Sequence, residues 1–146
     1  MLWLLLLFSI ELFPFPFIDN GNGTVKDNFT NLIWQKCSVG RSNDSLCSGT
    51  STSMTWQLGM QSCKNLNLAG RIWRLPNINE LFTLVDYSNT NNINTIIFPN
   101  NESSIYWSST TYISSTSSAW RLTFFTGATT ANSKTNVHYI RCVSGP

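Results

Sequence analysis

The 146-residue chain has few charged residues and one histidine, and these shortages narrow its possible functions. Only 11% of residues are Asp, Glu, Lys or Arg, and nine basic against seven acidic residues leave a formal net charge of +2. Nucleic-acid-binding domains concentrate Lys and Arg on one face or along one helix. The basic residues here are scattered through the sequence, so we expect no nucleic-acid partner.

The patterns of common metal and nucleophile sites are also missing. The chain has no Cys-x-x-Cys pair, and His138 and Cys142 alone have the close spacing that structural zinc ligands show. Residues 19–24 lack the spaced acidic ligands and terminal Glu of an EF-hand calcium loop, and their Asn-Gly steps predict a hairpin turn instead. We therefore predict no metal site and no cofactor.

No apolar run reaches the roughly 20 residues that a transmembrane helix needs. Residues 1–17 form a shorter apolar segment similar to the hydrophobic region of a signal peptide. Its flanks fit poorly, because no Lys or Arg precedes the run, Glu11 follows it closely, and Pro14 and Pro16 interrupt it. We interpret residues 1–17 as a possible degenerate signal peptide, with a misplaced start inside a longer gene as the alternative. Residues 18–146 then form a single domain.

The chain does contain four cysteines, namely Cys37, Cys47, Cys63 and Cys142. An even number of cysteines without closely spaced pairs is typical of disulfides in exported domains. We expect two disulfides and an extracytoplasmic location, whether secreted, cell-surface or periplasmic. Residues 38–53 are rich in Ser, Gly, Asn and Thr, which predicts a surface loop closed by a local bridge between Cys37 and Cys47.

Periodicity predicts two helices in the middle of the chain. The first is capped by Thr55, carries apolar residues at three- and four-residue steps, and ends at Gly70. The second begins with Asn77 and Glu80, which have the spacing of a capping box. Its apolar stripe consists of Ile78, Leu81, Phe82 and Val85.

Alternation of apolar and polar residues predicts strands toward both ends of the chain. The predicted strands are residues 32–36, 105–109, 120–125 and 138–143. Two stretches rich in Ser and Thr, residues 110–118 and 127–136, are predicted to be loops at the solvent edge of the resulting antiparallel sheet. Helices grouped in the middle and strands at both ends favour the α+β class.

A set of short motifs, in their order along residues 18–144, resembles the C-terminal domain family of the Legionella collagen-like adhesin. The motifs are residues 19–25 (DNGNGTV), 32–36 (LIWQK), 73–76 (WRLP), 80–81 (EL), 98–99 (FP), 106–109 (YWSS) and 139–143 (YIRCV). The resemblance implies a C-type-lectin-like fold with two helices packed on a twisted antiparallel sheet. That fold is related to the fold of formylglycine-generating enzymes.

The resemblance also implies a cysteine pairing and a class of partner. C-type lectin domains tie the first helix to the last strand, which implies a Cys63–Cys142 bridge and leaves Cys37 and Cys47 as the local pair. The adhesin relative binds sulfated polymers and assembles as a trimer, so the implied partner is a glycan, a sulfated polysaccharide or a surface protein, with a possible homotrimer.

We predict a binding module and not an enzyme, and two alternatives stay open. One is a formylglycine-generating type of enzyme that uses a free cysteine, although nothing beyond the final strand matches those enzymes. The other is a structural interaction domain of an envelope protein. The Glu-Pro-Asn and Gln-Pro-Asp triplets of calcium-dependent lectins are absent, so calcium-dependent sugar binding is not expected.

Four residues are our candidate ligand-binding side chains. Tyr112 is the aromatic residue that we expect at the surface, whereas Trp107 and Trp120 are predicted to lie in the core. The other candidates are basic and could contribute a weak patch for a sulfated polysaccharide. They are Arg41, Arg121 and Lys134.

Overall fold

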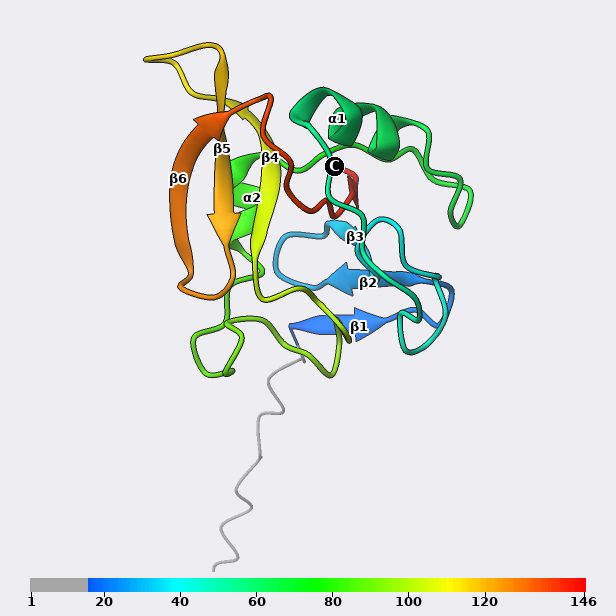
Figure 1. Ribbon diagram of the computed structural model, residues 1–146. Coiled ribbons are helices and arrows are strands. Elements are labelled where there is room, and N and C mark those ends of the chain that lie inside the picture. Colours follow the sequence, from blue (N-terminus) through cyan, green and yellow to red (C-terminus); the bar gives the residue numbers. More distant parts are fainter. Residues whose placement is uncertain (1–15) are drawn as a thin grey trace, which may run out of the picture.

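The computed structural model describes residues 16–146, which form two antiparallel sheets and two helices (Figure 1). The first sheet has the strand order β1-β2-β3-β7, and the second has the order β4-β5-β6. The strands are β1 (Phe17–Asp19), β2 (Thr24–Asp27), β3 (Ile33–Gln35), β4 (Ile105–Thr111), β5 (Ser118–Thr123), β6 (Ala128–Ser133) and β7 (Val143–Ser144). The predicted α+β class is confirmed, but the strands form two sheets where a single sheet was expected.

The chain enters the first sheet through the predicted hairpin, in which β1 pairs with β2. Side chains in the turn satisfy its backbone: Asp19 Oδ1 accepts a hydrogen bond from the Gly21 amide at 2.9 Å, and Asn22 Oδ1 accepts one from the Thr24 amide at 3.2 Å. Gly21 has a φ of 72°, a conformation that favours glycine. Of the predicted signal-like segment, residues 1–15 lie outside the described residues.

The last stretch of the chain corrects the predicted strand over residues 138–143. Only β7 is a regular strand there, and three isolated bridges precede or accompany it: Met54 with His138, Tyr106 with Tyr139, and Arg74 with Val143. Successive residues thus pair with different elements. This segment joins the two sheets, which a regular strand within one sheet could not do.

The third strand of the second sheet is β6, which lies within the stretch predicted as a solvent-edge loop. It pairs with β5 along six residues, from Ala128 opposite Thr123 to Ser133 opposite Ser118. As an edge strand with no fully buried residue, β6 needs few apolar side chains. Its Thr- and Ser-rich composition therefore gave no strong strand signal.

Both helices are shorter than predicted. Helix α1 (Trp56–Lys64) ends well before Gly70, and Thr55 occupies the N-cap position without a side-chain cap hydrogen bond. Helix α2 (Ile78–Phe82) has five residues, and the predicted capping box between Asn77 and Glu80 is confirmed. The predicted apolar stripe is only partly correct, because Phe82 is 45% exposed and Val85 lies beyond the helix.

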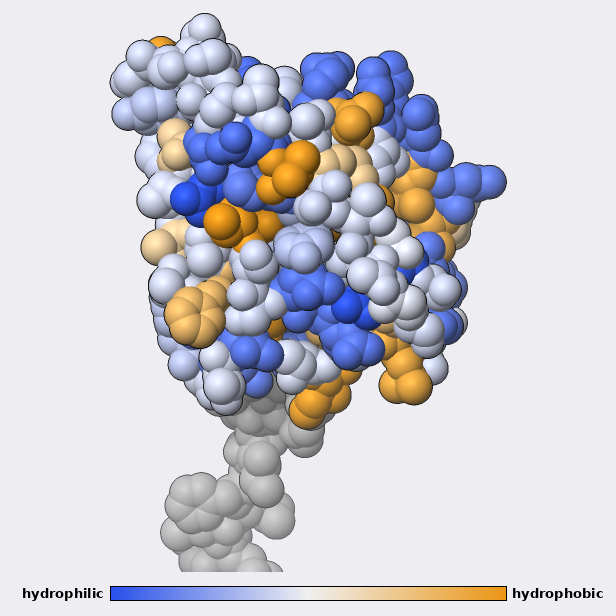
Figure 2. All heavy atoms as spheres, in the orientation of Figure 1, coloured by the Kyte–Doolittle hydropathy of each residue, from blue (hydrophilic) through white to orange (hydrophobic). Residues whose placement is uncertain are grey.

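The buried apolar residues form two clusters. One lies between the sheets and α2, and its largest members are Trp34, Leu81, Phe98, Tyr106, Leu122 and Phe124. The other lies beneath α1 and includes Trp73, Trp107, Ile140 and the Cys63–Cys142 bridge. On the face shown in Figure 2, hydrophobic residues form small, separate patches among hydrophilic and neutral ones.

Both disulfides are formed with the expected pairing, Cys37 with Cys47 and Cys63 with Cys142. The first closes a ten-residue loop, and the second ties α1 to the residue before β7 across a sequence separation of 79. No free cysteine remains among residues 16–146. The two disulfides indicate an oxidising, extracytoplasmic environment.

Arg141 is a fully buried cation between the two clusters. Its guanidinium donates to the backbone carbonyls of Gln35 and Lys36 and, at 2.8 Å, to the side-chain oxygen of Asn101. It also lies 4.8 Å from the centre of the Phe98 ring. No carboxylate is among its hydrogen-bond partners in the described chain, so neutral oxygens compensate for its loss of water.

Candidate functional site

Aromatic side chains gather at one margin of the second sheet, where α2 packs on β5. Trp120 lies on β5 and is partly exposed, and the Tyr112 ring stands edge-on to it with centroids 5.3 Å apart and planes at 89°. The prediction that Trp120 lies in the core is wrong, because the residue is partly exposed. Leu122, two residues further along β5, is fully buried in the cluster that includes Leu81 of α2, whereas Trp120 borders a surface cavity.

The partly exposed Trp120 ring borders a shallow cavity of about 350 Å³. Ile78 and Phe82 of α2 supply further apolar walls, and the Asn79 amide and Thr129 hydroxyl supply neutral polar groups. No charged residue lines this cavity. Such a surface is suited to a small ring that has an apolar face and peripheral hydroxyl groups.

Arg121 lies on the opposite face of β5 from Trp120, because neighbouring residues of a strand point to opposite sides. Its guanidinium donates a 2.9 Å hydrogen bond to the Thr123 hydroxyl. His138 is near, and its ring packs against Trp107 with centroids 4.5 Å apart and planes tilted at 58°. Burial, together with the positive charge of Arg121, lowers the pKa of His138 to about 4. His138 is therefore neutral at pH 7.

Lys134 follows β6, and its ammonium group holds the loop between β4 and β5. It donates to the Thr111 hydroxyl and the Thr116 carbonyl, both at 2.9 Å, and lies 4.1 Å from the centre of the Trp56 ring. These contacts use at least two of its three donors within the protein. These contacts indicate that Lys134 stabilises the fold and is not free to bind a ligand.

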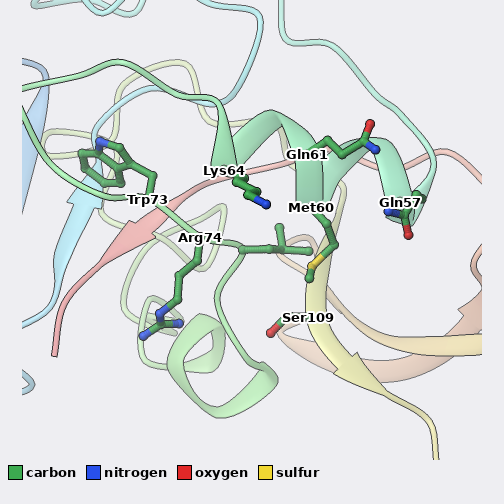
Figure 3. Close-up of a pocket in the computed structure, with 8 residues that line it drawn as sticks. Gln57, Met60, Gln61, Lys64, Trp73, Arg74 and Ser109 are labelled. Atoms are coloured by element: carbon green, nitrogen blue, oxygen red, sulfur yellow. The ribbon is translucent and has the colours of Figure 1, made fainter.

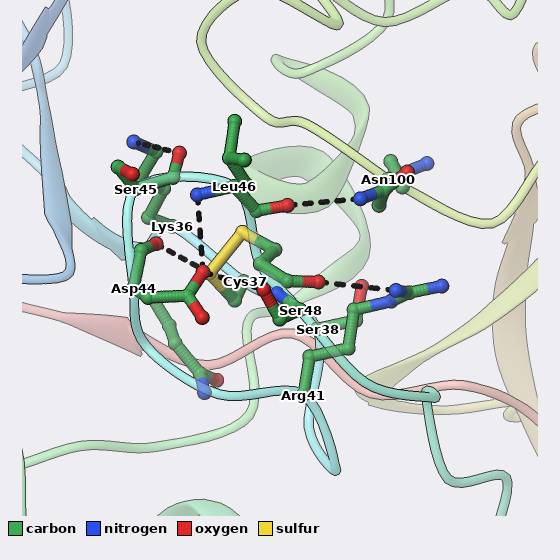
Figure 4. The surroundings of a disulfide bond; sticks show 12 residues. Lys36, Cys37, Ser38, Arg41, Asp44, Ser45, Leu46, Ser48 and Asn100 are labelled. Carbon is green, nitrogen blue, oxygen red and sulfur yellow. Dashed lines mark hydrogen bonds between the residues drawn. A yellow bond between two sulfur atoms is a disulfide. The ribbon is translucent and has the colours of Figure 1, made fainter.

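Arg41 also bonds other groups of the protein, and it lies within the loop that the Cys37–Cys47 bridge closes (Figure 4). It forms a 2.7 Å ion pair with Glu102 and donates to the carbonyls of Cys47 and Gly49 at 3.1 and 2.6 Å. Its side chain is 13% exposed. The four candidate residues therefore do not form one site: Tyr112 joins Trp120, whereas the three cations hold other parts of the fold.

A second and larger cavity, of about 480 Å³, runs beside α1 and was not predicted from the sequence (Figure 3). Its lining comes from α1, from the segment before α2 and from β4. The residues are Gln57, Met60, Gln61, Lys64, Trp73, Arg74, Leu75 and Ser109. This groove depends on the packing of three separate elements, so no local motif could have revealed it.

The described part of the chain shows neither a membrane-spanning helix nor a metal-binding cluster. Among residues 16–146, no helix is long and apolar enough to cross a bilayer. No group of three or more His, Cys, Asp or Glu side chains is placed there to hold a metal ion.

Comparison with known proteins identifies the family of this chain. A search of the curated proteins found no match. The profile of the Lcl C-terminal domain family matches residues 23–144, which is most of the chain and nearly all of the described part. This chain belongs to the Lcl C-terminal domain family.

Proposed function

We propose that this domain is an extracytoplasmic, adhesin-like binding module that recognises a glycan at the cavity beside Trp120. The oxidised cysteines support an exported protein, and membership of the Lcl C-terminal domain family is consistent with a role in binding. The bridge from α1 to the residue before β7 is also the one that the C-type-lectin-like likeness implies. Recognition on such a scaffold belongs to the margins and loops of its sheets.

The partly exposed Trp120 ring, braced by Tyr112, is the observation that carries this proposal. An indole face packs against the apolar face of a sugar ring, while neighbouring amide and hydroxyl groups bond the sugar hydroxyls. Asn79 and Thr129 provide those groups here. Because the Tyr112 ring packs against the indole, Trp120 loses little conformational freedom when a ligand binds.

A neutral glycan fits this cavity better than a sulfated polysaccharide does. The cavity lining contains no cation, and the three basic candidates have partners inside the protein: Arg41 bonds Glu102, Lys134 bonds Thr111, and Arg121 bonds Thr123. The enzyme alternative has little support, since a nucleophilic cysteine must be free and all four cysteines are in disulfides. The homotrimer implied by the resemblance stays a prediction, which sedimentation analysis would test.

A glycan array followed by titration of the best ligand tests the proposal. We expect a neutral glycan to bind, and Trp120→Ala to weaken that binding at least tenfold. Phe125→Ala is the matched control, because Phe125 is 69% exposed but does not line the cavity. The proposal is wrong if no neutral glycan binds, if heparin alone is retained, or if Trp120→Ala binds as tightly as the wild type.

A further inference from the structure

The surface around the start of β1 is apolar. Pro16 and Phe17 border two shallow hollows, of about 380 and 160 Å³, and contribute to the lining of both. Phe29 and Tyr87 lie in the wall of the larger hollow, and Ile96 lies in that of the smaller one. We call these five residues the β1 patch, because β1 begins at Phe17.

Three members of the β1 patch project into solvent. The exposed fraction is 74% for Phe29, 66% for Tyr87 and 87% for Ile96. Side chains with so much exposed surface stand out from the protein and do not form the walls of a deep cleft. A cluster of exposed apolar residues usually marks a contact with another molecule or with a membrane.

The two hollows offer neither a cation nor an unbonded carboxylate among the described residues. No Lys or Arg lines them, and the larger hollow has two carboxylates that are bonded within the protein. The Thr30 hydroxyl donates to Asp27 Oδ2 at 2.6 Å, and the Ser88 amide donates to Asp86 Oδ1 at 3.0 Å. The β1 patch is therefore suited to an apolar partner and not to a partner recognised by its charge.

The residues that precede the β1 patch in the sequence are apolar as well. Residues 1–15 contain a single charged residue, Glu11, and residues 2–8 read LWLLLLF. An apolar segment of this length is too short to span a bilayer, which takes about 20 residues, but it can enter the outer part of one. Because this segment is joined directly to Pro16, its entry would hold the β1 patch close to the lipid.

We propose that the β1 patch rests on a phospholipid bilayer that residues 1–15 enter. Phe29, Tyr87 and Ile96 insert at the boundary between the headgroups and the acyl chains, a region where aromatic rings are favoured. A bilayer fits this surface because projecting side chains need a deformable apolar phase and not a matched groove. Since no cation lines the hollows, the contact does not require anionic lipid.

This inference goes beyond glycan binding and is independent of it, because the glycan cavity shares no lining residue with the two hollows. The Tyr87 hydroxyl donates to the Gly127 carbonyl at 3.4 Å, which places the β5–β6 turn at the patch end of the second sheet. In Figure 1 the β4–β5 loop, which begins with Tyr112, lies at the opposite end of the molecule from β1. Tyr112 therefore faces away from the bilayer.

Paramagnetic broadening of NMR signals locates the face that meets the lipid. The full chain is bound to phosphatidylcholine nanodiscs in which some headgroups carry a gadolinium chelate. We expect the signals of Phe29, Tyr87 and Ile96 to broaden and that of Ile113 to stay sharp. Ile113 is the matched control, because it is equally exposed but lies in the β4–β5 loop.

Co-sedimentation with phosphatidylcholine vesicles measures the contribution of the patch. The double variant Phe29→Ser/Ile96→Ser should bind roughly tenfold more weakly than the wild type, because two apolar side chains leave the contact. The control Ile72→Ser/Ile113→Ser changes equally exposed residues outside both hollows and should bind as the wild type does. Raising NaCl from about 0.1 M to about 1 M should leave wild-type binding in place, because the contact is not ionic. Urea midpoints check that both variants are folded.

Each other occupant of the patch has its own outcome. If residues 1–15 fold back over it, a soluble gadolinium chelate will fail to broaden the Phe29 and Ile96 signals in lipid-free protein. If a second copy covers it, the wild type will sediment as a dimer and Phe29→Ser/Ile96→Ser as a monomer. Either result overturns the inference. It is also overturned if the patch signals stay sharp in nanodiscs, if Phe29→Ser/Ile96→Ser binds vesicles as tightly as the wild type, or if salt abolishes binding.

Discussion

The Tyr112 ring stands perpendicular to the Trp120 ring, at 89° and with centroids 5.3 Å apart. This edge-to-face contact joins the end of β4 to β5 beside the proposed glycan cavity. Tyr112 is not among the residues that line the cavity. We therefore expect Tyr112 to contribute to the proposed binding by holding Trp120 in place.

Substitution of Tyr112 tests this positioning. Tyr112→Ala removes a contact worth about 0.5–1.5 kcal/mol and frees the indole, so glycan affinity should fall roughly three- to tenfold. Tyr112→Phe keeps the ring and should bind as the wild type does. Isothermal titration calorimetry of the three proteins makes the comparison. If Tyr112→Ala binds the glycan as tightly as the wild type, the contact with Tyr112 does not contribute to binding.

The two disulfides should contribute unequally to stability. In the chain-entropy description, closing loops of 79 and 10 residues is worth about 4.5 and 2.7 kcal/mol respectively. Replacing Cys63 and Cys142 by alanine should therefore lower the free energy of unfolding more than replacing Cys37 and Cys47. Urea denaturation of the two double variants measures the difference. The reverse order would show that strain or residual structure in the unfolded chain outweighs loop entropy.

Arg141 should tolerate no shorter cation. Its planar guanidinium bonds two carbonyls and the Asn101 side chain at once, which a lysine ammonium cannot do from the same position. Arg141→Lys should lower the free energy of unfolding by about 3 kcal/mol. Arg71→Lys, at an exposed residue, should change it by less than about 0.5 kcal/mol. Equal urea midpoints for the two variants would contradict the structural importance of Arg141.

His138 should make stability depend on pH in a defined window. Its pKa in the folded protein is about 4, below its ordinary value of 6.5. Between these values the unfolded chain binds a proton that the folded protein does not, so stability is lost as pH falls from about 6.5 to about 4. The loss is about 1 kcal/mol, a modest value because the ring is only partly buried.

The variant His138→Gln isolates this contribution from that of the carboxylates. Its stability should fall less than that of the wild type between pH 7 and pH 4.5, as measured by urea denaturation at each pH. An NMR titration of the histidine ring in Arg121→Gln should also show a higher pKa than in the wild type, because one of the two causes has been removed. Parallel pH profiles for wild type and His138→Gln would contradict the assignment.

Features encoded by nearby residues could be predicted from the sequence. The Asn77–Glu80 capping box, the turn at residues 19–24 and the local Cys37–Cys47 bridge each depend on a short stretch of chain. The resemblance supplied the distant Cys63–Cys142 pairing, which spacing alone left open. The α+β class followed from the grouping of predicted helices in the middle of the chain and predicted strands toward both ends.

Features that depend on tertiary packing could not be predicted. Strand β6 is an edge strand with no fully buried residue, so it needs few apolar side chains, and the exposure of Trp120 depends on how α2 packs beside β5. Arg41 lies in a polar loop, where a cation is usually exposed to solvent. Its charge is instead paired with that of Glu102, which is 61 residues away in the sequence. The groove beside α1 likewise appears only when three elements meet. Composition and periodicity carry no information about such contacts.

The indole NMR signal of Trp120 provides the most direct test of the proposed function. The protein contains six tryptophans, of which Trp34 and Trp107 are fully buried and serve as internal references. On titration with a neutral glycan selected from the array, the Trp120 indole resonance should shift in proportion to occupancy while those of Trp34 and Trp107 stay in place. A glycan that binds without moving the Trp120 resonance would contradict the proposed site.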